Sequence, residues 1–469
     1  MKSQRSFVIL LLTVVASRIP LLFGGFGADG DAWRIAHTAH RLWTEGVYQV
    51  SRFPGFPVFE ILQTPVIILG GSFASNLSTL IVFLFSIILF RSIILRWNIP
   101  NADLLLISYS FLPILWKNSA VTMDYIWGLT GILGAVTLLL NKRFISAGIV
   151  LGFAAGTRLS HLALFFPLLL LFNGTERKQM LHFTIWSVMI TILCYFPVFL
   201  SDDFFGVIQE YLARTNNISL LKKTGAFFYR IIFSLGLLGS LAIGIVLFIS
   251  REKVRSHMQS RTSRVSLAII LTIVVVFSLI PDEREYLIPA MPFLLILLAL
   301  TGSRNHFAVV TVVLISYAFI SLDVTDHDPL SPSTGLKKQK GFVVKEYGDR
   351  SRNEQRRIHL AQYSIPDSSI VMIGMGPIFW YDNPYVTWDQ KMERKFRQDC
   401  ARSLRGKEVY YIYALKKPQL TLLRQRGYTV YYWDEMKLFL ETFIGYNLAD
   451  ERIAPVSSFG VITPSQQYP

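Results

Sequence analysis

Two aspartates, Asp29 and Asp31, directly follow the first apolar run of the chain and open a helical pattern that continues to Trp43. A carboxylate at that place can act as a general base toward an acceptor hydroxyl. An Asp-Gly-Asp sequence before a helix is also typical of a helix cap followed by a turn residue. The residue types therefore leave two interpretations open, a reactive carboxylate pair and a structural cap.

Further polar residues interrupt or border later apolar runs. Asp124 begins one run, where a charge is costly unless it faces a cavity or a partner, and helix N-capping is the competing interpretation. Arg158 and His161 interrupt another run, and Arg284 and Tyr286 precede a third. Arginines can bind a phosphate through charge-assisted, often bidentate bonds, whereas interfacial anchoring explains the same positions without chemistry.

Arg52 lies in a segment, 51–57, whose two prolines and one glycine rigidify a turn. The amphipathic pattern at 58–69 predicts a helix that lies along a membrane surface. We expect both to belong to one structured outer loop, 24–75. A loop that only caps the helix bundle is the alternative.

The elements that must position these residues are apolar. Of the 469 residues, 52% are hydrophobic and only 16% are charged, and the mean hydropathy is +0.43. Several runs approach the roughly 20 residues that a helix needs to cross a bilayer. The net charge of +15 is concentrated in short loops such as 251–264, as the positive-inside rule predicts, so we expect no nucleic-acid partner. With only Cys194 and Cys400, neither a disulfide framework nor a cysteine zinc site is expected.

The pattern predicts eleven membrane spans with a cytoplasmic N-terminus. A single long buried helix is the alternative for the two short spans within 144–172. The basic loops place the polar residues above together on the extracytoplasmic face. The predicted spans are 6–23, 76–95, 102–116, 123–140, two within 144–172, 181–200, 229–249, 265–281, 287–301 and 306–322.

The composition changes after this membrane body, 1–322. We predict a linker at 323–345 and a soluble extracytoplasmic α/β domain at 346–469, which begins with a charged amphipathic segment. Its sheet is expected to be mostly parallel. Strand patterns lie at 369–374, 408–413 and 428–433, and helical patterns at 390–404 and 417–426.

The order of these motifs resembles that of the membrane-embedded GT-C glycosyltransferases, which include protein O-mannosyltransferases and the aminoarabinose transferases that modify lipid A. Asp29 and Asp31 with the Arg-x-Pro-Gly-x-Pro stretch from Arg52 look like the family's first outer loop. Asp124 looks like its second acidic position. The glycine-rich segment 148–158 and the Arg-Glu-Tyr-Leu-Ile-Pro segment from Arg284 are similar to two later motifs. The family's Asp-Glu pair is Asp31-Ala32 here, so the second acid is absent or replaced.

The resemblance implies an α-helical polytopic fold with about eleven transmembrane helices and a C-terminal extracytoplasmic α/β domain. It implies an inverting transfer of a sugar from a polyprenyl-phosphate donor to a lipid, glycan or protein acceptor at the cell membrane. Asp31 is then the first candidate for the catalytic base and Asp29 the second. The substrate- or phosphate-binding candidates are Asp124, Arg158, His161, Arg284, Tyr286 and Arg52. No residue is assigned to a metal, although the three aspartates could hold a divalent cation through oxygen ligands.

Two other classes of function compete with a glycosyltransferase. A transporter or lipid flippase predicts charges at mid-membrane and two related halves, and no repeat is visible. A non-catalytic assembly subunit would use the C-terminal domain for binding. The sequence contains no P-loop, no GxGxxG after a strand and no HExxH, so nucleotide hydrolysis and zinc proteolysis lack their usual support.

Overall fold

The structure is a computed structural model that divides into two compact units. The first unit is Met1–Asp323 with Leu336–Ser351, and the second is Val324–Gly335 with Arg352–Pro469. The residues described are 4–200, 220–325, 334–361, 369–372, 410–411, 421, 429–433 and 459–462.

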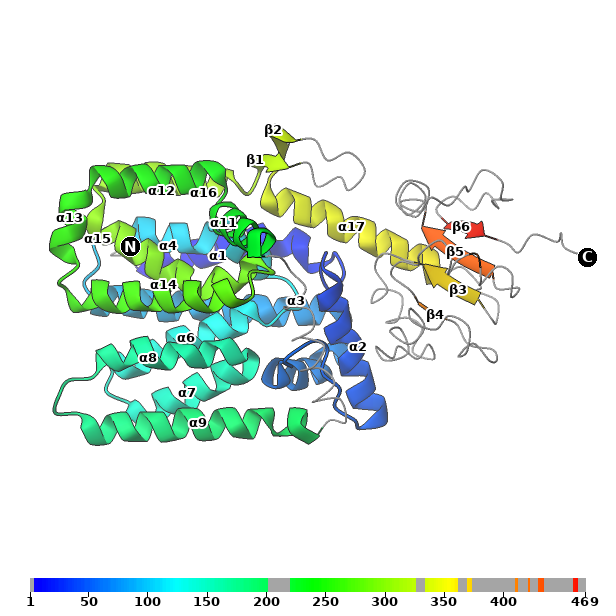
Figure 1. The fold of residues 1–469 in the computed structure, drawn as a ribbon, viewed down its shortest axis with the longest axis horizontal. Coiled ribbons are helices and arrows are strands. Elements are labelled where there is room, and N and C mark those ends of the chain that lie inside the picture. Colours follow the sequence, from blue (N-terminus) through cyan, green and yellow to red (C-terminus); the bar gives the residue numbers. More distant parts are fainter. Residues whose placement is uncertain are drawn as a thin grey trace, which may run out of the picture. The chain divides into compact units, whose positions relative to one another are not determined.

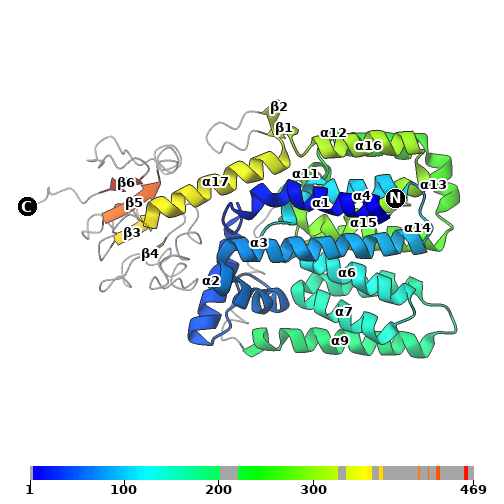
Figure 2. The ribbon, with the colours of Figure 1, turned by 180° about the vertical axis from the view of Figure 1, so that it is seen from behind.

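The first unit is a body of apolar helices, most of which run side by side in both views (Figures 1 and 2). Helix α2 stands across one end of this body, and the basic helix α13 lies at the opposite end. The elements are α1 (Gln4–Leu22), α2 (Gly30–Glu45), α3 (Pro57–Arg96), α4 (Ala102–Phe111), α5 (Pro113–Asn118), α6 (Tyr125–Leu140), α7 (Phe144–Thr157), η1 (Leu159–Leu164), α8 (Phe165–Leu168), η2 (Leu169–Leu171), α9 (Arg177–Leu200), α11 (Leu220–Ser234), α12 (Leu237–Ile249), α13 (Arg251–His257), α14 (Arg261–Leu279), η3 (Arg284–Ala290), α15 (Met291–Thr301) and α16 (Arg304–Ser316).

Five helices of the described residues are long and apolar enough to cross a membrane, and a sixth span results if one bent pair is counted. Shorter apolar helices complete the set, so each predicted span has a helical counterpart. Many large apolar side chains on α1, α3, α9 and α14 remain exposed, as a lipid-facing surface requires. The prediction of a polytopic helical membrane body is confirmed.

Helix α3 joins the predicted amphipathic segment and the span that follows it. Gly71 separates them, because its φ of 59° and ψ of −150° are not helical. That conformation is open to glycine and strained for residues with a Cβ atom. The two patterns in the sequence, 58–69 and 76–95, therefore correspond to two helical segments on either side of Gly71.

Three glycines of α7 explain why the glycine-rich motif is needed. A Cβ atom on Gly148 would lie 2.6 Å from the Phe183 carbonyl oxygen, and one on Gly152 would lie 2.6 Å from the Ile190 Cβ atom. Gly156 faces Cys194 in the same way, at 2.7 Å. Small residues four apart let two membrane helices approach closely. The motif thus packs α7 against α9.

The segment 144–172 forms two short apolar helical segments, Phe144–Thr157 and Leu159–Leu171, where two short spans were predicted, and the alternative of one long helix is wrong. Two other expectations need correction. Residues 220–228, expected in a loop, belong to α11, and the predicted span 229–249 is bent by 82° between α11 and α12. Gly236, with φ of 76°, forms the bend, and a Cβ atom there would meet the Tyr317 ring at 2.7 Å.

The segment after α16 holds β1 (Ile320–Thr325) and β2 (Thr334–Lys340), which form a two-stranded sheet. Helix α17 (Phe342–Ala361) follows and contains the predicted amphipathic segment. Its first part, to Ser351, belongs to the unit of the membrane body. The compact body therefore extends beyond residue 322, where the sequence pattern ends it.

The second unit contains a four-stranded sheet with the order β4-β3-β5-β6. Strand β3 is parallel to β4 and β5, and β5 is antiparallel to β6, so the expectation of a mostly parallel sheet is confirmed. The sequence pattern missed β6. The predicted helices at 390–404 and 417–426 lie outside the described residues, apart from residue 421. The strands are β3 (Ser369–Met372), β4 (Tyr410–Tyr411), β5 (Thr429–Trp433) and β6 (Phe459–Ile462).

Candidate functional site

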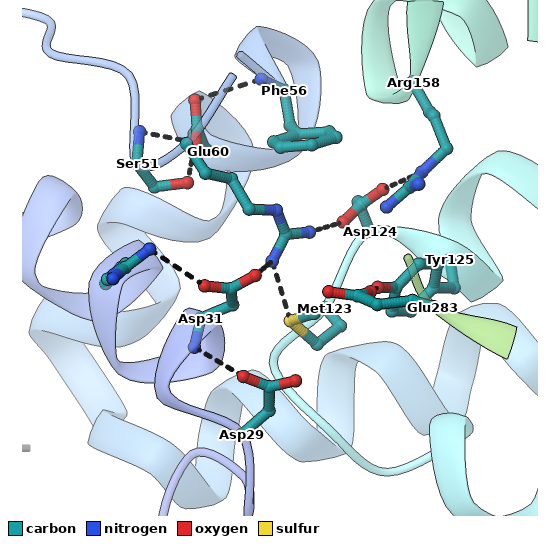
Figure 3. A network of polar contacts seen from close by, with 12 residues as sticks. Asp29, Asp31, Ser51, Phe56, Glu60, Met123, Asp124, Tyr125, Arg158 and Glu283 are labelled. Carbon is teal, nitrogen blue, oxygen red and sulfur yellow. Dashed lines mark hydrogen bonds and ion pairs between the residues drawn. The ribbon is translucent and has the colours of Figure 1, made fainter. Parts of the chain in front are cut away.

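Four charged side chains from separate segments of the body form one continuous chain of ion pairs, which we call the charge chain: Asp31, Arg52, Asp124 and Arg158. The Arg52 Nη1 atom lies 3.0 Å from Asp31 Oδ2, and its Nη2 atom pairs with Asp124 Oδ1. Asp124 Oδ2 lies 2.8 Å from Arg158 Nε. Asp31, Asp124 and Arg158 converge from three helix ends in Figure 3. Carboxylates and guanidinium groups thus alternate along the chain.

The two aspartates of the first loop have different structural roles. Asp29 is exposed and caps α2, because its side chain accepts a hydrogen bond of 3.0 Å from the Asp31 backbone amide. Asp31 lies inside the first turn, and its carboxylate pairs with Arg52 and, at 3.3 Å, with Arg34. The capping interpretation therefore holds for Asp29, while Asp31 presents its carboxylate to the charge chain.

Asp124 is completely buried at the start of α6 and makes no side-chain capping bond. Both carboxylate oxygens face guanidinium groups instead. Burial alone would raise the pKa of Asp124, but the charges of Arg158 and Arg52 outweigh it and lower that pKa. Burial likewise opposes the charge of Arg52, and Asp31 and Asp124 outweigh it and raise the pKa of Arg52. The centre of the charge chain is therefore ionised.

Glu60, near the start of α3, fixes the loop that carries Arg52. Its carboxylate, 1% exposed, accepts hydrogen bonds from the Ser51 backbone amide at 3.1 Å and from the Phe56 backbone amide at 3.3 Å. The hydroxyl groups of Ser51 and Tyr48 also donate to it. Because these bonds bracket Arg52 on both sides, Glu60 sets the position of its guanidinium group. A glutamate inside an otherwise apolar amphipathic pattern was the signal in the sequence.

Arg158 ends α7 with an extended backbone and enters a group of aromatic rings. Its guanidinium carbon lies 4.5 Å from the ring centres of Tyr125 and Tyr286 and 5.2 Å from that of Phe56. Such cation–π contacts orient the guanidinium plane. Tyr286, a predicted site residue, is thus brought to the charge chain.

Glu283 is a further acidic residue at this end of the body that the sequence did not single out. Its Oε2 atom accepts a hydrogen bond from the Tyr125 hydroxyl. Burial raises the pKa of Glu283 to about 7, with nearby Asp29 and Asp31 adding to the effect and Arg52 opposing it. The side chain can therefore gain or lose a proton near neutral pH.

Two predicted site residues make their contacts elsewhere. His161 is buried, its Nδ1 atom lies 3.1 Å from the Ala154 carbonyl oxygen, and its ring fills the space beside Gly128. Arg284 donates to the Phe233 carbonyl oxygen and to the Tyr317 hydroxyl, both at 3.3 Å. The structure therefore brings Asp31, Arg52, Asp124, Arg158 and Tyr286 together, and it places Arg284 against other partners.

No group of three or more His, Cys, Asp or Glu side chains within the described ranges is arranged to hold a metal ion. Of the three aspartates considered for a divalent cation, Asp124 has both oxygens paired with arginines. The carboxylates of the charge chain that pair with arginines, Asp31 and Asp124, are thus already compensated by guanidinium groups rather than by a cation.

These features define a polytopic helical membrane protein with a charged site at one end of its body. No protein-family model matches the sequence, and no curated protein sequence matches it either. Two solved structures of ArnT from Cupriavidus metallidurans have a similar fold. The form bound to undecaprenyl phosphate has a TM-score of 0.57 and 11% identity and covers 100% of both chains. The apo form has a TM-score of 0.58 and 12% identity and covers 99% of both chains. The chain therefore shares the fold of these ArnT structures over its full length.

Proposed function

We propose that this protein is a GT-C glycosyltransferase that transfers a sugar from a polyprenyl-phosphate donor to an extracytoplasmic acceptor. The charge chain is the observation that carries the proposal, since it places a partly open carboxylate and an arginine with unused donors in one site. The full-length similarity to ArnT, one form of which binds undecaprenyl phosphate, supports a lipid phosphate donor.

Asp31 is the base in this proposal. Its side chain is 18% exposed, whereas that of Asp124 is completely buried. The acceptor hydroxyl oxygen attacks the anomeric carbon, its proton passes to Asp31, and the bond between that carbon and the phosphate oxygen breaks. The transfer inverts the anomeric configuration. A carboxylate within hydrogen-bond reach of the hydroxyl supplies the general base that this step needs.

Arg158 is the best placed group for the leaving phosphate. Its Nε atom binds Asp124, and its two Nη atoms make no hydrogen bond to any described residue. Arg52 already uses both Nη atoms on carboxylates, and Arg284 uses one on Phe233 and Tyr317. A guanidinium fork with two unused nitrogens can bind two phosphate oxygens and stabilise the charge that develops as the bond breaks.

The remaining candidates have supporting positions. Tyr286 and Tyr125 orient Arg158, and Arg52 links Asp31 to Asp124. The acceptor is a lipid, a glycan or a protein, and the site faces away from the cytoplasm at the cell membrane. The position of the basic helix α13 at the other end of the body supports this orientation.

The positions of the charges favour an enzyme over a transporter. Asp31, Asp124 and Arg158 stand within one turn of the end of a helix. A transport pathway is expected to place such charges midway along its helices.

Asp31→Asn in the full chain tests the proposal, with Asp29→Asn as the matched control two residues away. Membrane lipids and glycans are compared by mass spectrometry in cells lacking the gene and in cells carrying each variant. Purified proteins are then assayed for sugar transfer from the donor identified. We expect Asp31→Asn to lower turnover by about 10²- to 10⁴-fold, the usual contribution of a general base. Asp29→Asn keeps a side-chain oxygen that can cap α2 and should keep most activity.

An unchanged glycan and lipid profile after deletion of the gene would argue against a glycosyltransferase. Full transfer activity in Asp31→Asn, with loss in Asp29→Asn, would move the base to Asp29.

A further inference from the structure

The first part of α17 is fixed to the membrane body by its backbone. The amides of Gly341, Phe342 and Val343 donate to the carbonyl oxygens of residues 319, 317 and 318, at 2.9, 3.0 and 3.1 Å. Gly341 is required at this contact, because a Cβ atom there would lie 2.2 Å from the Phe319 carbonyl carbon. The start of α17 therefore has one defined place against the end of α16.

Phe342 adds a side-chain contact at the same place. Its ring stacks on Tyr317 with 5.8 Å between the ring centres. The Arg284 guanidinium carbon lies 4.9 Å from the Phe342 ring centre, and the Lys117 Nζ atom lies 5.1 Å from it. These contacts give Arg284 a structural role in holding α17.

One turn further along α17, two charged side chains are buried in the body. Glu346 is 5% exposed and Arg350 is 0% exposed, and they pair at 2.7 Å. Arg350 Nη1 also donates to the carbonyl oxygens of Leu21 at 2.8 Å and Ala120 at 2.6 Å. A Cβ atom on Gly24 would lie 2.9 Å from that of Arg350, so the arginine stem fills the space beside the end of α1.

Glu346 connects this group to the loop that carries the proposed base. Its Oε1 atom accepts a hydrogen bond of 3.2 Å from the backbone amide of Ala28, the residue before the cap Asp29. Its Oε2 atom lies 3.6 Å from Lys117 Nζ, which binds Glu285 at 2.9 Å. Burial opposes the charge of Glu346, but Lys117 and Arg350 outweigh it and lower the pKa of Glu346 to about 2.

Charged residues on a helix such as α17 ordinarily lie on its solvent-exposed face. Glu354 and Arg357 do so, because they form a partly exposed ion pair. Glu346 differs because it is buried and bonded to a distant loop. A charged hydrogen bond to a backbone amide constrains that loop more strongly than an exposed ion pair does. Its removal would take away the hydrogen bond between Glu346 and the amide of Ala28, three residues from Asp31.

We propose that Glu346 is a positioning residue: it holds the 24–29 turn through the amide of Ala28 and thereby sets the place of Asp31 in the charge chain. The ion pairs with Lys117 and Arg350 keep the Glu346 carboxylate in the position from which it binds Ala28. The catalytic consequence rests on the proposed function, whereas the structural consequence does not. The functional body then includes the first half of α17.

Amide hydrogen exchange of the full chain in lipid nanodiscs tests the structural consequence. Glu346→Ala removes the carboxylate that accepts from the Ala28 amide, and Glu354→Ala is the matched control on the same helix. We expect exchange at residues 25–31 to rise about tenfold or more in Glu346→Ala, to stay unchanged in Glu354→Ala, and to stay unchanged in α6 in both. Unchanged exchange at 25–31 in a folded Glu346→Ala protein would overturn the proposal.

Glu346→Gln is the second variant, for the case that Glu346→Ala fails to fold. It keeps the size of the side chain and one acceptor oxygen but loses the charge that Lys117 and Arg350 hold. Exchange at 25–31 should then rise less than in the alanine variant, while α6 stays protected. Exchange that remains at the wild-type level in this variant, with the alanine variant unfolded, would assign Glu346 to stability alone and overturn the proposal.

Kinetics separate positioning from stability. Misplacement of a catalytic group by about 1 Å can cost 10²-fold in turnover. Glu346→Ala should therefore lower kcat by about 10- to 100-fold with little change in the KM for the lipid donor, and Glu354→Ala should match the wild type. Equal kinetics in Glu346→Ala and wild type would overturn the catalytic consequence. If the wild type itself transfers no sugar, the proposed function fails, and the exchange experiment still decides the role of Glu346.

Discussion

Arg158 and Arg18 are both buried in the helical body, yet their surroundings differ in kind. Arg158 binds a carboxylate through Nε and has two Nη atoms without a hydrogen bond to any described residue. Arg18 is completely buried and uses all three nitrogens: Nε on Ser119, Nη1 on Ser17 and Nη2 on the Ser110 carbonyl oxygen. No carboxylate of the described chain forms an ion pair with Arg18. Burial of an arginine is common to both, so burial alone does not mark a functional group.

Unused hydrogen-bond donors, rather than burial, distinguish Arg158 from Arg18. Arg18 lies against the rings of Phe83, Phe111 and Trp116, at 4.8 to 5.5 Å, and its donors end on neutral oxygens. All three guanidinium nitrogens of Arg18 have partners within the protein, so Arg18 has a structural role. The two Nη atoms of Arg158 make no hydrogen bond to a described residue and lie next to the Asp124 carboxylate. In the proposed function, a phosphate can therefore bind these atoms without breaking an existing bond.

Asp124→Asn should have the largest effect, because it removes the carboxylate between Arg52 and Arg158. Arg158 then loses its ion pair and Arg52 keeps only the one with Asp31, and breaking a buried ion pair in this way costs about 3–5 kcal/mol. We expect a large loss of thermal stability and of transfer activity. Thermal unfolding in detergent and the transfer assay measure the two losses.

The double variant Asp124→Asn with Arg158→Gln is the control for that result. It removes the arginine whose ion pair was lost, so it should be more stable than Asp124→Asn alone while remaining inactive. A coupling energy of zero between the two substitutions would mean that the ion pair between Asp124 and Arg158 contributes nothing to stability.

Arg158→Lys should lower activity by about 10²-fold at nearly normal stability. The lysine ammonium keeps the charge, but it is a single point donor that cannot bind Asp124 and two phosphate oxygens together. Arg18→Lys is the matched control, for which we expect activity within about twofold of the wild type. Equal activities of the two lysine variants would remove the distinction between the two arginines.

The sequence predicted the members of the charge chain that stand at the ends of apolar runs. Asp31, Asp124 and Arg158 lie at such ends. Apolar runs that end on the same side of the bilayer place their last residues at the same end of the helix bundle. Arg284 has the same kind of position but contacts Phe233 and Tyr317 instead. A run boundary fixes the depth of a residue in the membrane, whereas its direction around the bundle depends on packing between distant helices.

The residues that the sequence did not single out depend on long-range contacts. Glu283 gains its place from Tyr125, 158 positions away, and Glu346 from Ala28, 318 positions away. A helix as charged as α17 is typical of a solvent-exposed surface, so its pattern gave no reason to place it in the body. Only the tertiary structure shows that Glu346 and Arg350 compensate each other in a buried position.

Arg18→Met should affect stability and leave catalysis unchanged. The substitution keeps apolar contacts with the surrounding rings but leaves the Ser110 carbonyl oxygen without its donor, which costs about 1–3 kcal/mol. We expect a lower Tm with kcat and KM within about twofold of the wild type. A selective loss of kcat in this variant would show that Arg18 also acts on the site, as Arg158 is proposed to do.

Glu283 should make the Tm depend on pH, an effect smaller than those above. Substitution of Arg18 should not produce such a dependence. Its folded pKa, about 7, lies above the ordinary value of 4.5, so the folded protein holds this proton more tightly than the unfolded chain does. The resulting stability is fully present below pH 4.5 and is lost as the pH rises through 7. Glu283→Gln should flatten the dependence of Tm on pH across that window by roughly 2–4 °C. Arg18→Met should lower Tm equally at every pH of the series, since an arginine does not titrate there. If Arg18→Met and Glu283→Gln changed the pH dependence alike, the proton on Glu283 would not be the cause of it.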